Sequence, residues 1–334
     1  MKGYPKVNYI GNKERIADAI MSAVPAYAGT LFDAFAGGCS VSYAAKARGM
    51  RVYSNDILDI NYQLAKALIE NSGEVLTDRD VEDIFTGEPF CGFMTGNYAD
   101  VYYFPRECME LDLYRRNIGR IDNGYKRAMA YALMRRAMIR KMPYSRFTIK
   151  WDKVRQLRDE QYSYEKYGRY RSYHNKSFRF HFEDNLGDYN SAVFSNGQDN
   201  VALNMDVYDA IDAVDADVVY ADPPYAGTMN NYYGFYGLLD TYIRQEKTMP
   251  FANSFMDKDT IMEQFDRLFA ALGKYRCLIL SYNSRSIPTR EQIAGLLSRY
   301  RRNIRIQEIR HAYKVTGKEK KGKDIEYLFI ADND

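Results

Sequence analysis

The sequence predicts an α/β fold, in which a doubly wound parallel sheet is interrupted by a largely helical insertion. Strand-like apolar runs alternate with helical patterns near the N-terminus and again after about residue 190, which is typical of a parallel sheet. Between these two regions the alternation stops, and helical, polar and aromatic sequence takes its place. Because 334 residues exceed the usual size of one core, one large or two unequal domains are expected.

The first predicted unit is a strand–helix–strand segment between residues 30 and 69. The run TLFDAFAGG is apolar and ends in Gly37 and Gly38, SVSYAAKARG has helical periodicity, and RVYSND is a short second strand. This order is typical of the segment that opens a parallel sheet.

The middle of the chain is basic and aromatic. GYKRAMAYALMRRAMIRKM predicts a helix that Pro143 stops, and the stretch after it has no clear period. Between Arg115 and His181 there are 19 lysines and arginines against five acids, together with eight tyrosines. Basic side chains neutralise phosphates and aromatic rings stack on bases, so this mixture favours nucleic-acid binding. A solvated helical face with tyrosines in the core is the alternative interpretation.

The alternation resumes after the insertion. DADVVYADPPY predicts a buried strand that ends in a rigid corner, DTIMEQFDRLFAALG an amphipathic helix, and YRCLILSYNS another buried strand. REQIAGLLSRYRR predicts a helix, and IRIQEIRHAYKV and DIEYLFI predict two strands around the basic turn TGKEKKGK. We therefore expect one discontinuous domain, residues 1–75 and 190–334, around an inserted domain at residues 76–189.

Composition argues against several classes of protein. No apolar stretch approaches the roughly 20 residues that cross a bilayer, and the N-terminus lacks the apolar region of a signal peptide. The four cysteines are far apart, with neither the spacing of a zinc site nor the density of a disulfide framework. The three histidines show no metal-binding or catalytic spacing. We expect a cytoplasmic protein with reduced thiols, no metal ion and no membrane contact.

The turn FDAFAGGCS, between the first strand and its helix, suggests a cofactor site. Glycines there let the backbone pass close to a ligand, and the helix N-terminus offers free N–H groups. Asp56 ends the second strand, where an acid of a doubly wound fold accepts hydrogen bonds from ribose hydroxyls. The GxGxxG pattern of dinucleotide-binding proteins is missing. These features indicate a nucleoside-containing cofactor, and a plain strand-to-helix turn is the alternative.

The corner DPPY lies at the carboxyl end of a buried strand, where open α/β sheets place ligands. Pro223 and Pro224 have fixed φ angles and donate no backbone N–H, which leaves carbonyl oxygens as acceptors. Asp222 adds another acceptor, and the Tyr225 ring offers a stacking plane. The corner is suited to an aromatic amine, such as that of a nucleobase. A strand-terminating turn with a surface acid is the alternative.

Three motifs together carry a family resemblance. The corner DPPY, the turn DAFAGG and the N-terminal NYIGNK resemble the Dam-like group of S-adenosylmethionine-dependent N6-adenine DNA methyltransferases. The order also matches, because in that group the cofactor loop comes first, the target-recognition domain second and DPPY third. The similarity covers about residues 6–70 and 198–330. It implies a Rossmann-like methyltransferase sheet and methyl transfer to the N6 amine of an adenine flipped out of duplex DNA.

The resemblance also implies which residues hold the cofactor, S-adenosyl-L-methionine. Those at its methionine end and in its loop are Tyr9, Lys13, Asp33, Phe35 and Gly37. Those at its ribose and adenine are Asp56, Asp206 and Val207. One residue departs from the pattern: Cys39 stands where the family's loop usually has its second glycine, which tightens the approach of the backbone to the cofactor.

Catalysis is assigned by the same resemblance to the corner, Asp222, Pro223, Pro224 and Tyr225, with Asp222 also bordering the cofactor. Asp222 and the Pro223 carbonyl accept the two amine hydrogens, and Tyr225 stacks on the flipped base. The glycine-rich, aromatic segment AGTMNNYYGFYG after the corner is predicted to be a loop that closes over the base. DNA contacts are expected from the insertion, with candidates Arg135, Arg136, Arg140, Lys141, Arg146 and Lys150.

The expected partners are double-stranded DNA and a cognate restriction endonuclease, although an orphan or phage methylase that acts without one fits equally. We expect a monomer or weak dimer in the cytoplasm, associated with the nucleoid. An RNA adenine methyltransferase, an N4-cytosine methyltransferase and a catalytically inert DNA-binding relative are the alternatives. Asp rather than Ser at the first position of DPPY favours adenine over cytosine, because the cytosine-directed relatives usually resemble SPPY.

Overall fold

The computed structural model describes residues 3–168, 170, 172–224, 232–247, 255, 257–310 and 325–333. Within them lies a seven-stranded sheet of order β3-β2-β1-β4-β5-β7-β6. Its parallel strands are β1 (Thr30–Asp33), β2 (Arg51–Asn55), β3 (Val201–Leu203), β4 (Val218–Ala221) and β5 (Cys277–Asn283). The antiparallel edge is β7 (Ile325–Asp332) followed by β6 (Asn303–Arg310).

This topology confirms the predicted α/β fold. The strand order reverses between β1 and β4, so the connections leave these neighbours in opposite directions and open a crevice at their carboxyl ends. All four residues of β4 are buried, as expected of a central parallel strand covered on both faces. The two C-terminal strands form the predicted pair, and the basic turn between them lies outside the described residues.

Helices cover both faces of the sheet. Helices α11 (Val207–Ala213), α13 (Ile261–Ala271) and α14 (Arg290–Leu297) pack on one apolar cluster. Helices α1 (Ala17–Ala23), α2 (Ser40–Ala47) and α3 (Asp59–Ala65) pack on a second cluster on the other side, where α3 continues into a π-helical turn (Lys66–Glu70). No helix in the described residues is long and apolar enough to cross a membrane.

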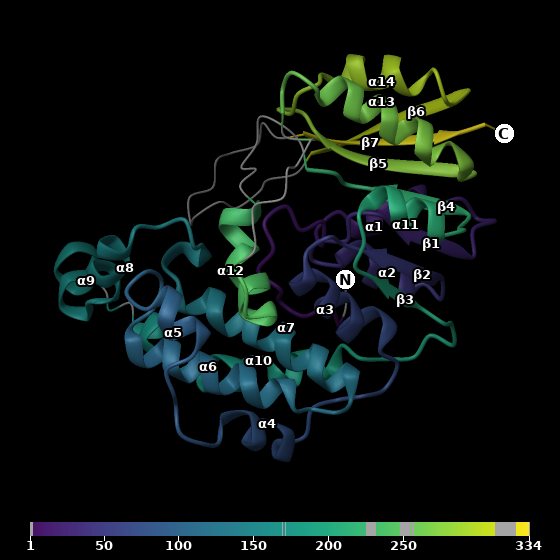
Figure 1. The fold of residues 1–334 in the computed structure, drawn as a ribbon. Coiled ribbons are helices and arrows are strands. Elements are labelled where there is room, and N and C mark those ends of the chain that lie inside the picture. The colour runs from purple at the N-terminus through teal and green to yellow at the C-terminus, as the bar shows by residue number, and fades with distance from the viewer. Residues whose placement is uncertain are drawn as a thin grey trace.

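The insertion is helical and gathers on one side of the molecule, away from α13 and α14 (Figure 1). Its helices are α4 (Asp78–Phe85), α5 (Phe93–Tyr98), α6 (Pro105–Gly119), α7 (Gly124–Lys141), α8 (Trp151–Arg158), α9 (Glu160–Tyr167) and α10 (Phe178–Ser191), with short 3₁₀ turns at Pro143–Ser145 and Ser172–Asn175. The apolar cluster beneath α1 to α3 continues into α6, α7 and α10. The insertion therefore shares a core with the part of the chain that forms the sheet, called the sheet half below. The domain boundaries at residues 75 and 190 stay a prediction.

Helix α7 is the predicted basic helix, and local chemistry fixes both of its ends. The Asn123 side chain accepts hydrogen bonds from the first backbone N–H groups, those of Tyr125 and Lys126. The helix stops before Met142, whose extended backbone (φ −89°, ψ 130°) is the conformation that a following proline favours. Most of α7 is buried, and it lies against α3.

Helix α12 (Tyr232–Arg244) stands where the chain leaves the DPPY corner. The segment at residues 226–237 was expected to be a loop, and this expectation is wrong from Tyr232 onward, because the aromatic residues there lie on a helix. The buried carboxylate of Asp240 accepts the N–H groups of Asp59 (3.1 Å) and Ile60 (2.9 Å) at the start of α3. This cap ties α12 to the sheet half beside the insertion (Figure 1).

Candidate active site

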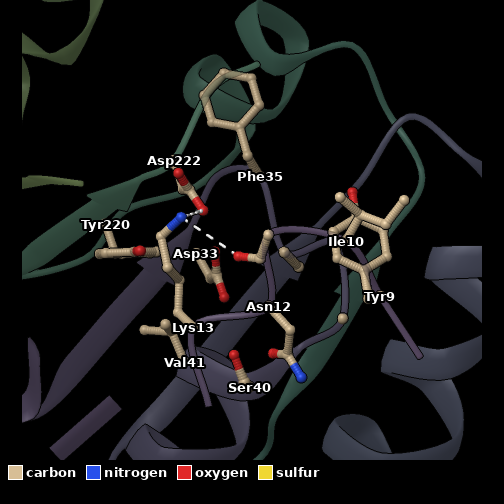
Figure 2. Close-up of a pocket in the computed structure, with 14 residues that line it drawn as sticks. Tyr9, Ile10, Asn12, Lys13, Asp33, Phe35, Ser40, Val41, Tyr220 and Asp222 are labelled. Carbon is tan, nitrogen blue, oxygen red and sulfur yellow. Dashed lines mark hydrogen bonds and ion pairs between the residues drawn. The ribbon is translucent and has the colours of Figure 1, made fainter. Parts of the chain in front are cut away.

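The carboxyl ends of β1 and β4 and the start of α2 meet the N-terminal segment in one cavity (Figure 2). The cavity encloses about 370 Å³, part of it open to solvent. Six of the predicted site residues line it: Tyr9, Lys13, Asp33, Phe35, Gly37 and Asp222. Residues far apart in the sequence are thus brought together at the switch point of the sheet, where ligands of this fold class bind.

Lys13 is the central cation of the cavity. Its Nζ lies 2.8 Å from Asp222 Oδ2 and 3.2 Å from Glu326 Oε1, and its side chain is only 6% exposed (Figure 2 shows the contact with Asp222). Glu326 comes from β7, opposite the last residue of β5, and also accepts a hydrogen bond from the Ser281 hydroxyl at 3.0 Å. A buried cation held between two carboxylates keeps its position and holds the Asp222 carboxylate in one orientation.

Asp33 provides a buried acceptor that faces the cavity. Its Oδ2 accepts hydrogen bonds from the Ser42 hydroxyl (2.6 Å) and amide (3.2 Å), while Oδ1 has no partner among the described residues. Burial raises the pKa of Asp33 to about 7, although the bonds from Ser42 oppose the shift. Asn12 also lines the cavity, and its side-chain oxygen is buried without a partner among the described residues. Two unmatched acceptors suit a ligand rich in donors, such as an ammonium group.

The glycine turn lies directly under the N-terminal segment. Gly37 has φ +51°, and a Cβ there would lie 2.6 Å from the Tyr9 ring, so glycine is required by both conformation and space. The Gly37 amide donates to Asp56 Oδ2 at 2.8 Å, and the Leu58 amide donates to Asp56 Oδ1 at 2.9 Å. Burial raises the pKa of Asp56. Asp56 therefore shapes the turn, and each carboxylate oxygen keeps capacity for a further hydrogen bond.

Cys39 occupies a left-handed backbone conformation, with φ 61° and ψ 18°. Glycine adopts this conformation without a steric penalty, which gives a physical reason why a family pattern would have glycine at this position. The thiol is fully buried, and its Sγ lies 3.9 Å from the Gly37 carbonyl oxygen. The thiol packs below the turn and is not among the residues that line the cavity.

The remaining predicted residues lie near the same edge of the sheet. Asp206 caps α11 by accepting the Tyr208 amide at 2.9 Å, and Val207 is buried at the start of that helix. Neither lines the cavity, although both follow β3 at the ligand-binding edge. In the corner, Pro223 is buried and Pro224 half-buried, and Tyr225 lies outside the described residues.

The insertion distributes its predicted DNA contacts unevenly. Arg135, Arg136 and Lys141 are buried, with exposed fractions of 1%, 5% and 2%. They face the protein interior because α7 is the central helix of the insertion, so the structure offers no support for their contact with DNA. Lys150 is exposed, and Arg140 and Arg146 are half-buried. These three remain predictions.

The sequence analysis did not predict Asn12, which lines the cavity, or Glu326, which pairs with the lining residue Lys13. Asn12 lies inside the NYIGNK motif, between residues that were chosen, so its place in the motif was a usable sign. Glu326 is an acid within the apolar strand DIEYLFI, and an inward-facing charge in a buried strand needs a partner. The partner, Lys13, is more than 300 residues away, so only the fold reveals the pair.

Comparison with known proteins agrees with this geometry. Residues 9–295 match the family model described as D12 class N6 adenine-specific DNA methyltransferase. The chain belongs to this family. It is also 57% identical over 330 residues, 99% of this chain and 98% of the relative, to the Type II methyltransferase M2.HphI of Haemophilus parahaemolyticus. The modification methylase StsI of Streptococcus sanguinis is 25% identical over 333 residues, 88% of this chain and 46% of that protein.

The D12 family membership confirms the predicted class and the Rossmann-like methyltransferase fold. The chain is a site-specific DNA adenine methyltransferase, so the cavity at the carboxyl edge of the sheet is the candidate active site of a methyl-transfer enzyme.

Proposed function

We propose that this methyltransferase uses S-adenosylmethionine to methylate the N6 amine of an adenine rotated out of duplex DNA, in the cavity that holds Lys13 and Asp222. The observation that carries the proposal is the ion pair between the buried Lys13 and the partly buried Asp222, at 2.8 Å, on the ligand-binding edge of the sheet. It supplies a fixed, charged acceptor where an amine must be held.

The residues present fit the cofactor. S-adenosylmethionine supplies an electrophilic methyl group on a sulfonium sulfur. Asp33 and Asn12 offer unmatched acceptors within the described residues for its ammonium group. The Gly37 turn admits a ligand close to the backbone, and Asp56 retains acceptor capacity for ribose hydroxyls. Phe35 lines the same cavity, and Asp206 and Val207 are proposed to border the cofactor's adenine.

Asp222 acts on the amine. The lone pair of the N6 nitrogen is delocalised into the adenine ring, so the nitrogen is a poor nucleophile. Hydrogen bonds from its two N–H groups to Asp222 and to the Pro223 carbonyl favour pyramidal geometry and localise the lone pair. Lys13 holds the Asp222 carboxylate in one orientation, from which it can accept the proton that the nitrogen loses. Positioning of this kind supplies about 7–11 kcal/mol in well-oriented reactions.

The duplex must release the base for this chemistry, at a cost of a few kcal/mol. The resemblance assigns stacking on the flipped adenine to Tyr225, and phosphate contacts are proposed for Arg140, Arg146 and Lys150 of the insertion. A role in restriction–modification is proposed from the printed names of the two relatives, a Type II methyltransferase and a modification methylase. A cytoplasmic, nucleoid-associated monomer or weak dimer fits this role.

Removal of the Asp222 carboxylate tests the proposal. Asp222→Ala should lower methyl transfer to DNA about 100- to 1,000-fold, because the loss of one preorganised hydrogen-bonding group at a reacting centre typically costs this much. S-adenosylhomocysteine should still bind, because Lys13 retains Glu326 and the cavity keeps its other lining residues. Asp188→Ala, which removes an exposed acid on α10, is the matched control and should leave both properties unchanged.

Labelled methyl groups transferred to mixed-sequence genomic DNA, followed by nucleoside analysis, provide the measurement. The product expected is N6-methyladenine. N4-methylcytosine, or labelling of RNA in preference to duplex DNA, would support the alternative substrates, and transfer retained by Asp222→Ala would contradict the catalytic assignment.

A further inference from the structure

Arg135, on α7, is a buried cation whose charge the described residues do not neutralise. Its side chain is 1% exposed, and none of its three guanidinium nitrogens has a hydrogen-bond partner among the residues that the structure describes. Within the described part of the chain, every other buried lysine or arginine has a carboxylate, amide or carbonyl partner: Lys13, Lys46, Arg136, Lys141, Arg158 and Arg301. Arg135 therefore differs from all of them.

The contacts that Arg135 does make are with two aromatic rings. Its guanidinium carbon lies 5.8 Å from the centroid of Tyr9 and 5.6 Å from that of Tyr236, and these two rings stack on each other at 4.9 Å. A cation over aromatic faces is attracted to them, but this attraction is weaker than the loss of hydration of a buried, unpaired guanidinium. An anion bound during function would supply the missing partner.

Arg135 lies behind the N-terminal side of the active-site cavity. Tyr9 lines that cavity, and the Tyr236 hydroxyl accepts the amide N–H of Ile10, another lining residue, at 2.7 Å. The positive charge of Arg135 also lowers the pKa of Asp56, the acid that holds the glycine turn, although burial raises that pKa more. The guanidinium is thus separated from the cofactor region by one aromatic side chain.

The chemistry of the reaction limits which anion can reach this place. A DNA phosphate stays at the surface, and a flipped adenine is neutral. The methionine end of S-adenosylmethionine carries both an ammonium and a carboxylate group. Asp33 and Asn12 offer acceptors for the ammonium, while Lys13 already contacts two carboxylates. Of the described cations near the cavity, Arg135 is therefore the one available to pair with the carboxylate of the cofactor.

We propose that Arg135 binds the carboxylate of the cofactor's methionine end, with Tyr9 turning aside to admit it. This assignment rests on the proposed use of S-adenosylmethionine and gives the central helix of the insertion a direct part in cofactor binding. It also explains why a helix of the insertion carries an unpaired charge toward the sheet half.

Arg135→Met tests the proposal, because an unbranched apolar side chain replaces the buried stem of the arginine and removes the charge. Two ligands that differ only in the carboxylate, S-adenosylmethionine and its decarboxylated form, are titrated by calorimetry in the absence of DNA. Wild-type protein should bind the carboxylate-bearing ligand about 10- to 100-fold more tightly, the range for a charge-assisted hydrogen bond. Arg135→Met should bind both ligands equally, at the level of the decarboxylated form. Arg155→Met, a half-exposed arginine of α8, is the control and should retain the wild-type preference.

Thermal unfolding gives a second readout. Unliganded Arg135→Met should melt at or above the wild-type temperature, because an unpaired buried charge is removed, while its stabilisation by S-adenosylmethionine should shrink. Arg135→Lys keeps the charge on a shorter donor and should retain part of the preference.

Three results would overturn the proposal. An unchanged preference in Arg135→Met would show that the carboxylate binds elsewhere. An equal loss for both ligands, with a lower melting temperature, would make Arg135 a packing residue. Wild-type protein that binds neither ligand would instead refute the cofactor assignment on which the proposal rests.

Discussion

The carboxyl edge of the sheet and the insertion are both rich in predicted functional residues. Six predicted residues of the sheet edge lie together at one cavity, whereas half of those in the insertion are buried in the protein interior. At the sheet edge, residues taken from three separate motifs, Tyr9, Asp33 and Asp222 among them, line one cavity. In the insertion, three of the six basic residues predicted to contact DNA are buried. A motif that restricts the backbone predicts where its side chains lie, whereas a count of charges predicts only that cations are present.

Substitution of one buried and one exposed lysine of the insertion would test this difference most strongly. Lys141 Nζ contacts Glu107 Oε1 at 2.8 Å and the Lys176 carbonyl oxygen at 2.6 Å, whereas Lys150 is exposed. Lys141→Met should lower the free energy of unfolding by about 3 kcal/mol, because it breaks a buried ion cluster that Arg158 shares. Lys150→Met should change it by less than about 0.5 kcal/mol.

Urea unfolding measures the stability of both variants, and DNA affinity over a range of salt concentrations measures the contacts. If Lys150 touches a phosphate, its loss reduces the salt dependence by about one counterion. A Lys141→Met variant of normal stability with weakened DNA binding would show that Lys141 contacts the duplex, as the basic composition of the insertion predicted.

The pH dependence of cofactor binding would test whether Asp33, at the sheet edge, binds the ammonium group of the cofactor. Because burial raises the pKa of Asp33 to about 7, the folded, unliganded protein holds a proton there between about pH 4 and 7 that the unfolded chain has lost. The stability contributed by this proton is present at low pH and is lost as the pH rises through 7. A ligand ammonium favours the ionised carboxylate, so binding should release the proton.

Affinity for S-adenosylhomocysteine should therefore rise up to about tenfold per pH unit between pH 5 and 7 and level off above 7. Asp33→Asn should flatten this profile. Calorimetry in two buffers of different ionisation enthalpy measures the proton released, and a pH-independent affinity in the wild type would remove Asp33 from the ammonium site. Asp240, whose pKa burial also raises to about 7, caps α3 outside the cavity lining and should not contribute.

The fold and the meeting of six predicted residues in one cavity could be predicted because they depend on local sequence. Apolar runs, the Gly37 turn and the consecutive prolines restrict the backbone directly, and a parallel sheet then brings the ends of its strands together. Glu326 was missed, and Arg135 was predicted to contact DNA, because the contacts of both depend on residues distant in the chain. The first pairs with Lys13 across the sheet, and the second is noticed only because its burial is known.

Substitutions of Cys39, with the smallest expected effects, test whether the glycine turn depends more on its left-handed backbone or on the packing of the side chain. In Cys39→Gly the left-handed conformation no longer costs about 1 kcal/mol, but burial of the thiol side chain, also worth about 1 kcal/mol, is lost. The melting temperature and the affinity for S-adenosylhomocysteine should therefore stay close to the wild-type values. Cys39→Ala keeps the backbone penalty and loses the packing, so it should be less stable than Cys39→Gly by about 1 kcal/mol. A Cys39→Gly variant that is the less stable of the two would mean that the turn relies on the side chain rather than on the left-handed backbone.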